Sequence, residues 1–220
     1  GATRTVTVNT GSGDGTLQLD LTDNNTIVDY TINPLGGAGA GNGNFAGQVY
    51  TLDKTVPTVV SITRTSANPS KAGSVNYLVT FSEPVYGVDA SDFTFTLSGV
   101  TGATVTSVGG SGATRTVTVN TGSGDGTLQL DLTDNNTIVD YTLNPLGGVG
   151  VGNGNFTGQA YTVDKTVPTV ASIIAISANP TTSGTNVSYA VIFSEPVYGV
   201  DAADFTFTLS GVTGATITSI

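Results

Sequence analysis

An internal repeat is the feature of this sequence that most constrains its fold. A stretch of 31 residues, GATRTVTVNTGSGDGTLQLDLTDNNTIVDYT, begins at Gly1 and returns unchanged 111 residues later at Gly112. The same spacing carries the segment DKTVPTV from Asp53 to Asp164. A period of this length exceeds that of solenoid repeats, whose units cannot bury a core alone, and suits a self-contained small domain. We therefore expect a string of similar domains.

The segment DKTVP marks the boundary between repeats. Pro57 favours an extended conformation at Val56, as a short linker requires. One complete repeat then spans residues 53–163, residues 1–52 match the C-terminal half of a repeat, and residues 164–220 match the N-terminal half of a further one. Neither half is expected to fold alone.

Two interpretations of this division remain open. Joining the end of one chain to the start of another would restore a repeat that lacks only residues 109–111. Either the chain is an excerpt of a longer array, or the half-repeats of identical chains complement each other head to tail and build a filament.

Alternating apolar and polar residues predict seven strands in the complete repeat. These are residues 58–63, 75–81, 93–97, 103–108, 113–120, 127–132 and 157–163. The 30 Gly and 8 Pro residues suit tight turns between short strands. Strands with one apolar face must pair those faces across two sheets. Each repeat is therefore predicted to be an all-β, antiparallel sandwich of the immunoglobulin-like type.

Composition excludes several classes of function. The chain has no His and no Cys, which excludes a Ser-His-Asp triad, a thiolate nucleophile and the usual zinc ligands. Its net charge of -10 would repel the phosphate backbone of nucleic acids. No apolar run approaches the roughly eighteen residues of a membrane span. A small sandwich also offers no evident cleft for a pair of catalytic carboxylates, so we expect a non-enzymatic protein with no membrane insertion in this segment.

Carboxylates are predicted to gather at one pole of each repeat. Counting antiparallel strands from the linker places the loops 82–92 and 133–156 at the same pole as Asp53. Two like charges about 4 Å apart repel by about 4 kcal/mol at an effective dielectric constant of about 20, so the cluster must spread into water or bind a cation. Loops rich in Asp suit Ca²⁺. The candidate ligands are Asp53, Glu83, Asp89, Asp92, Asp134 and Asp140, with their copies Asp164, Glu195, Asp201, Asp204, Asp23 and Asp29.

The segments DKTVPTV, YLVTFSEPVYGVDASDFTF and TGSGDGTLQLDLTDNNTIVD, the last followed by NPLGG, resemble bacterial Ig-like domain repeats of very large secreted surface proteins and adhesins. The resemblance covers the whole chain. It implies a β-sandwich that serves as a spacer or stalk, often with calcium at the domain junctions. One departure is Leu143, which stands where the family carries glycine and changes the turn that this loop can make. We expect Tyr141 and Leu143 to cover the core of the repeat at this turn.

From these features we expect an extracellular structural module of a bacterial cell-surface adhesin or fibre. Its partners would be neighbouring repeats of the same protein or identical chains head to tail. Any glycan or receptor contact would then lie elsewhere in the full protein. A filament subunit is the first alternative. A carbohydrate-binding module that uses the loop tyrosines Tyr86, Tyr141 and Tyr198 is the second.

Overall fold

The computed structural model describes residues 1–181 and 186–220, which form β-strands, turns and two short 3-10 segments. The chain divides into two compact units, Gly1–Lys165 and Thr166–Ile220. No helix in the described residues is long and apolar enough to cross a membrane. The predicted all-β, antiparallel architecture is confirmed.

Seven strands make up the complete repeat, and every strand end lies within one residue of its predicted position. The strands are β3 (Val59–Arg64), β4 (Ser74–Phe81), β5 (Phe93–Ser98), β6 (Thr104–Gly109), β7 (Thr114–Asn120), β8 (Gly126–Leu132) and β9 (Phe156–Val163). The 3-10 segment η1 (Ala90–Asp92) precedes β5. The agreement arises because the apolar residues recur with the period of two that an extended strand requires.

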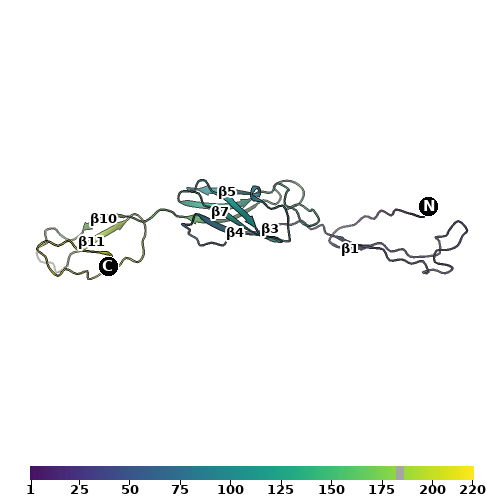
Figure 1. Ribbon diagram of the computed structural model, residues 1–220, viewed down its shortest axis with the longest axis horizontal. Helices are drawn as coiled ribbons and strands as arrows, with labels where there is room; N and C mark the ends of the chain where they lie inside the picture. The colour runs from purple at the N-terminus through teal and green to yellow at the C-terminus, as the bar shows by residue number, and fades with distance from the viewer. Residues whose placement is uncertain (182–185) are drawn as a thin grey trace. The chain divides into compact units, whose positions relative to one another are not determined.

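These strands form two antiparallel sheets. One has the order β3-β4-β7-β6 and the other has the order β5-β8-β9. In the first sheet β4 and β7 pair over seven residues, from Ser74 opposite Asn120 to Thr80 opposite Thr114. The strands of the two sheets occupy separate layers in the teal and green part of the ribbon (Figure 1). The apolar face of each sheet is thereby turned towards the other.

The core of the complete repeat contains a pair of tyrosines, one from each sheet. Tyr77 on β4 and Tyr161 on β9 are fully buried, with ring centroids 5.1 Å apart in an edge-to-face arrangement. The hydroxyl of Tyr77 donates to the Leu128 carbonyl at 2.9 Å, and that of Tyr161 donates to the Asn76 carbonyl at 2.7 Å. Both polar tips are therefore satisfied inside the core, as burial requires.

The flanking half-repeats contain far less regular structure. In residues 1–52 the strands are β1 (Gly15–Gln18) and β2 (Val49–Leu52), which pair with each other. Among the described residues of the C-terminal unit the strands are β10 (Val170–Ala175) and β11 (Tyr189–Phe193), which also pair, and the 3-10 segment η2 (Ala202–Asp204) follows them. Each half-repeat lacks the strands with which its own strands would pair in a complete sandwich.

Tyr141 and Leu143 do not cover the core, so that expectation is wrong. Both side chains are strongly exposed. Asp140 and Asn144 close a tight turn, in which the Asp140 amide donates to the Asn144 carbonyl at 3.1 Å. Leu143 adopts the left-handed conformation within this turn, with φ of 69°. The turn therefore forms with Leu143 at positive φ, and the side chains of Tyr141 and Leu143 lie in solvent.

Candidate metal centre

Three of the predicted ligands meet at one place. One carboxylate oxygen from each of Asp53, Glu83 and Asp140 lies within 4.8 Å of the other two. Asp53 begins the linker, Glu83 lies two residues after the end of β4, and Asp140 opens the turn in the long loop after β8. The three segments that strand counting assigned to a single pole therefore do approach one another.

Asn144 fastens the long loop to the linker at this site. Its Nδ2 lies 3.2 Å from the Asp53 carbonyl, 3.1 Å from the Thr55 carbonyl and 2.8 Å from Asp140 Oδ2. A second contact supports the first, because the Gly147 amide donates to the Pro57 carbonyl at 2.8 Å. These contacts hold Asp140 beside Asp53 without involving the Asp53 carboxylate.

Glu83 is the least satisfied member of the cluster. Its Oε1 is inaccessible to solvent and has no hydrogen-bond partner among the described residues. Burial raises the pKa of Glu83, and the nearby charges of Asp140, Asp53 and Asp14 raise it further. A buried acceptor without a donor is costly, and a cation would relieve both the missing contact and the repulsion.

Asp140 differs from Glu83, because backbone amides of the turn already donate hydrogen bonds to its carboxylate. Its Oδ1 accepts from the amides of Thr142 at 2.8 Å and Asn144 at 2.9 Å. Burial acts to raise the pKa of Asp140, but the hydrogen bonds from Asn144 and Thr142 outweigh it and leave the pKa lowered. Asp140 thus stays ionised and keeps a negative charge beside Glu83.

Asp89 and Asp92 serve a local structural purpose outside this cluster. Together they form a capping box around η1, in which Asp89 accepts from the Ser91 amide at 2.7 Å and Asp92 accepts from the Asp89 amide at 2.8 Å. Asp92 is fully buried and also accepts from the Thr137 hydroxyl at 3.0 Å. Burial raises the pKa of Asp92, whereas the bonds from Ser91 lower that of Asp89.

Asp134 organises the glycine-rich part of the long loop. The buried carboxylate accepts from the amides of Asn136 at 3.0 Å and Gly154 at 3.1 Å. Its copy Asp23 makes the same contacts with Asn25 and Gly43. Neither Asp belongs to the cluster of three carboxylates.

The remaining candidates are copies in the half-repeats. Asp201 and Asp204 form a capping box around η2, as their counterparts do around η1. Asp29 accepts from Thr31 and Asn33, and these bonds, led by the Asn33 side chain, lower its pKa to about 2. Glu195 again has a buried Oε1 that finds no hydrogen-bond partner in the part of the chain that the structure describes, and Asp164 is exposed directly after β9.

Sequence reasoning did not find the second set of linker contacts. Asp14, in the turn before β1, accepts from the amides of Lys54 at 2.6 Å and Thr55 at 3.2 Å, and its other oxygen accepts from the Thr55 hydroxyl. These bonds, led by that of the hydroxyl, lower the pKa of Asp14. Asp125 binds the Lys165 amide at 2.6 Å in the same way. The sequence signal here is the dipeptide Asp14-Gly15, which is typical of a hairpin turn and does not predict contacts with the linker.

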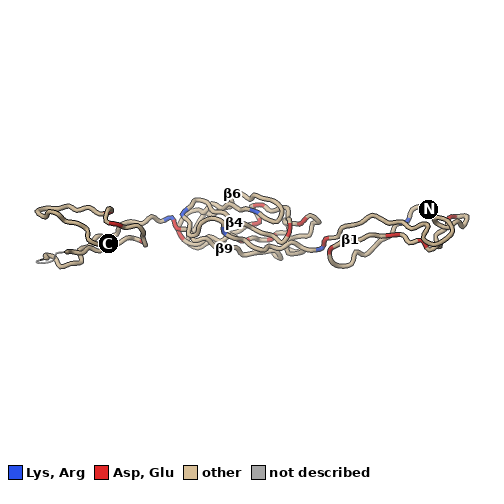
Figure 2. The backbone as a smooth tube through the Cα atoms, turned by 90° about the horizontal axis from the view of Figure 1, so that it is seen from below, with Lys and Arg blue, Asp and Glu red and all other residues tan. Residues whose placement is uncertain are grey.

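The spacing of the three carboxylates would allow them to bind one cation together. Two oxygens bound to one Ca²⁺ at about 2.4 Å can lie no more than about 4.8 Å apart, and the three carboxylates satisfy that limit. Carboxylate oxygens are the ligands that this ion prefers. Acidic residues predominate along the chain, 16 against 6 Lys and Arg (red and blue in Figure 2), so the local field also favours a cation.

Comparison of this chain with family models, curated proteins and solved structures finds no match to any of them.

Proposed function

We propose that this protein is a non-enzymatic spacer module of an extracellular bacterial surface protein, and that its linker holds successive repeats in a fixed relation. The observation that supports this most directly is the bonding of the linker on both sides. Asp14 of the preceding repeat binds the amides of Lys54 and Thr55, and Asn144 of the following repeat binds the carbonyls of Asp53 and Thr55. A linker with both edges bonded bends little, which is what a stalk needs.

The strand order supports an immunoglobulin-like assignment. A four-stranded sheet of order β3-β4-β7-β6 faces a three-stranded sheet of order β5-β8-β9. This is the order of the seven-stranded constant-type sandwich, in which the first, second, fifth and fourth strands form one sheet. Here the buried Tyr77 and Tyr161 fill the centre that a disulfide and a Trp fill in antibody domains.

Calcium is the proposed partner of the cluster at Asp53, Glu83 and Asp140. The ion would supply the missing contact to Glu83 and offset three negative charges beside the linker, so that binding stiffens the joint. Extracellular modules bind Ca²⁺ with dissociation constants of about 10⁻⁴ to 10⁻³ M, and we expect an affinity in that range.

Titration calorimetry with CaCl₂ tests the ion. The wild-type chain should bind Ca²⁺, and Glu83→Gln should weaken binding at least about tenfold, as expected when a charged ligand is lost. Glu195→Gln is the matched control, since Glu195 occupies the same place in a second SEPVYGVD segment for which the chain has no counterpart of Asp140. Equal binding by both variants would exclude this cluster as the site.

Backbone relaxation measured by NMR tests the linker. Asp14→Ala removes the bonds to Lys54 and Thr55, so the amide of Thr55 should gain nanosecond motion while that of Lys165 does not change. Asp125→Ala should have the reverse effect, and each variant is the control for the other. A linker that stays ordered in Asp14→Ala would contradict the proposed role.

A further inference from the structure

The sequence contains two Asn-Gly pairs, Asn42-Gly43 and Asn153-Gly154. Such pairs are chemically labile, because the nitrogen of a glycine can approach the side-chain carbonyl carbon of the preceding Asn and close a cyclic imide. Asn153 lies in the glycine-rich loop between β8 and β9, and Asn42 holds the same place in the first copy of that loop. The Asn153 side chain is exposed, so water can reach the group that would react.

The second pair is held in place by Asp134. The buried carboxylate of Asp134 accepts from the Gly154 amide at 3.1 Å, and its carbonyl accepts from the Gly152 amide at 3.0 Å. The Asn153 side chain is bound separately, because its Nδ2 donates to the Val149 carbonyl at 2.8 Å. The nitrogen and the side-chain amide that would have to meet are therefore each engaged elsewhere.

Close packing fixes the same peptide bond. A Cβ at Gly154 would lie 2.5 Å from Cγ of Leu146, whose side chain is fully buried. A Cβ at Gly147 would lie 2.6 Å from the Gly154 nitrogen. The backbone approaches so closely here that both positions require glycine. The Asn-Gly pair therefore arises from a packing requirement, and its lability is a consequence of that requirement.

The first copy of the loop repeats these contacts. The buried carboxylate of Asp23 accepts from the Gly43 amide at 3.1 Å, and its carbonyl accepts from the Gly41 amide at 2.9 Å. Nδ2 of Asn42 donates to the Ala38 carbonyl at 2.9 Å. The arrangement recurs although the residue that supplies this last carbonyl differs between the two copies.

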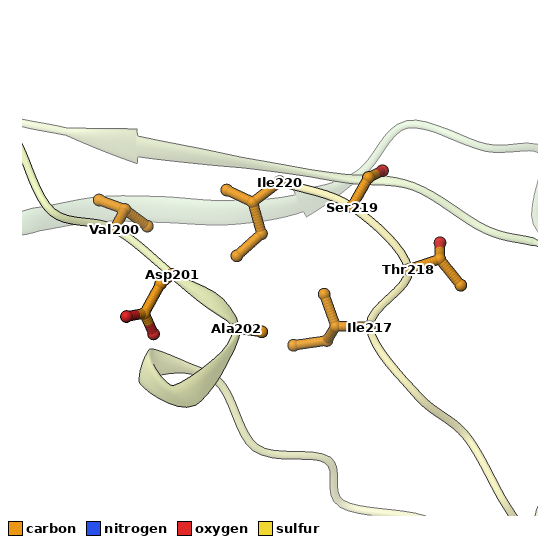
Figure 3. A pocket seen from close by; sticks show the side chains of 7 residues that line it. All are labelled: Val200, Asp201, Ala202, Ile217, Thr218, Ser219 and Ile220. Atoms are coloured by element: carbon orange, nitrogen blue, oxygen red, sulfur yellow. The ribbon is translucent and has the colours of Figure 1, made fainter.

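Other carboxylates of the chain bind amides without this consequence. Figure 3 shows Asp201 with its carboxylate directed away from the open space that the pocket side chains surround. Asp201 accepts from the Ala203 amide at 2.8 Å. The residue before that amide is Ala202, whose methyl group cannot form an imide. The amide that Asp134 binds is different, because the residue before it is Asn153.

We propose that Asn153 is a latent modification site, at which Asp134 slows the spontaneous conversion of the side chain to aspartate and isoaspartate. In this reaction the Gly154 nitrogen gives its proton to hydroxide and attacks Cγ of Asn153. A bond forms between these two atoms and the bond from Cγ to Nδ2 breaks, and Nδ2 takes a proton from water and leaves as ammonia. Water then opens the cyclic imide at either carbonyl.

Asp134 opposes the first step of this reaction in two ways. The hydrogen bond keeps the Gly154 amide directed at the carboxylate, so the nitrogen cannot turn towards Cγ of Asn153 without breaking it. The negative charge of the carboxylate also opposes the negative charge that develops on the nitrogen as its proton leaves. The reaction then requires a local opening of the loop. The inference depends on this loop alone and is independent of the spacer function and of calcium.

Modification would also disturb a contact between the loop and the linker. Isoaspartate adds a methylene group to the main chain at residue 153, where Gly147 approaches too closely to leave room for it. The Gly147 amide donates to the Pro57 carbonyl at 2.8 Å. Displacement of Gly147 would break this bond, so modification of one side chain would weaken the attachment of the linker.

Peptide mapping by mass spectrometry, after incubation of the 220-residue chain at mildly alkaline pH, measures the conversion of each Asn. In Asp134→Ala the rate at Asn153 should rise at least about tenfold, while the rate at Asn42 stays that of wild type. Asp23→Ala should have the reverse effect, so each variant is the control for the other. Asp134→Asn keeps an acceptor and loses the charge, so its rate at Asn153 should lie between those of wild type and Asp134→Ala.

Two comparisons separate this role from a general loss of stability. Gly158→Ala places a Cβ against the Leu130 carbonyl and leaves Asp134 intact, so Asn153 should react at the wild-type rate. In concentrated urea all the chains should react at one rate, faster than folded wild type, since they share the same Asn-Gly pair. Equal acceleration by Gly158→Ala and Asp134→Ala would overturn the proposal. A slower reaction in Asp134→Ala would also overturn it, because the carboxylate would then draw the proton from the nitrogen and promote ring closure.

Discussion

At the level of single residues, the repeat provides pairs of identical residues of which one is buried and the other is exposed. Tyr161 is fully buried and its hydroxyl oxygen accepts from the amides of Thr65 at 3.1 Å and Ser66 at 2.8 Å, whereas its copy Tyr50 is 71% exposed. The two tyrosines differ in environment and hardly at all in local sequence. Substitutions made in both copies therefore separate the effect of burial from the effect of residue type.

Tyr161→Phe should lower the free energy of unfolding by about 1 to 3 kcal/mol, because it removes the hydroxyl that accepts from the amides of Thr65 and Ser66 and donates to the Asn76 carbonyl. Tyr50→Phe should change it by less than about 0.5 kcal/mol, because Tyr50 is exposed. Urea unfolding followed by circular dichroism measures both. A similar loss in the two variants would mean that residues 1–52 are packed in the monomer.

Glu83 gives a prediction in which the sign depends on calcium. Burial and neighbouring carboxylates raise the pKa of Glu83 in the folded chain above its value in the unfolded chain. Ionised Glu83 then costs stability above its folded pKa, and the cost disappears as the pH falls below the ordinary Glu value of about 4.3. Without calcium, Glu83→Gln should therefore melt at a higher temperature than wild type at pH 7, and the difference should vanish in acid.

Excess CaCl₂ should reverse the order at pH 7, since only the wild-type carboxylate gains from the ion. Differential scanning calorimetry with chelator and with calcium provides the comparison. If wild type is the more stable protein in both conditions, then ionised Glu83 does not destabilise the fold and there is no cost for a cation to relieve.

At the level of strands, sequence periodicity predicted the elements well and the loops poorly. The alternation in YLVTF and TVTVN places β4 and β7 to within a residue, because burial on one face imposes a period of two. The acids of the loops carry no such signal. Asp89, Asp92 and Asp134 accept amides in caps and turns, a use of Asp as common as metal binding, and only the fold distinguishes them from Asp53 and Glu83.

The identical heptapeptides make the same point about strands. Residues 114–120 form β7 between β4 and β6, whereas residues 3–9 have the same sequence and form no strand. Sequence predicts a capacity for strand structure, and the neighbouring strands decide whether that capacity is realised. This is why the periodic pattern could not show which copy pairs.

Gly158, in the middle of β9, has no room for a side chain. A Cβ there would lie 2.3 Å from the Leu130 carbonyl oxygen and 2.7 Å from Cγ2 of Ile62. Gly158→Ala should therefore destabilise the complete repeat by about 1 to 3 kcal/mol through overpacking. Gly109→Ala is the control, since a Cβ at Gly109 meets nothing within 4 Å. Urea midpoints that coincide for the two variants would contradict this packing between β9 and β3.

At the level of the whole molecule, a stable core is confined to half of the chain. The buried hydrophobic residues of the described part all lie between Ile62 and Val163. The denaturant dependence of unfolding grows with the surface exposed. The 220-residue chain should therefore unfold in urea with the m value of a 111-residue domain, the length of the complete repeat. An m value that matches 220 residues would show that the half-repeats bury a core of their own, against the exposure of Val6, Tyr50 and Tyr189.

The first and last strands of the complete repeat determine how it would respond to tension. The chain enters through β3, which pairs with β4, and leaves through β9, which pairs with β8, each in antiparallel register along most of its length. A force applied to the two ends acts along these strands and perpendicular to their hydrogen bonds. The hydrogen bonds of each strand pair therefore bear the load together and do not break one at a time. Such a shear geometry resists extension until a whole strand slides free.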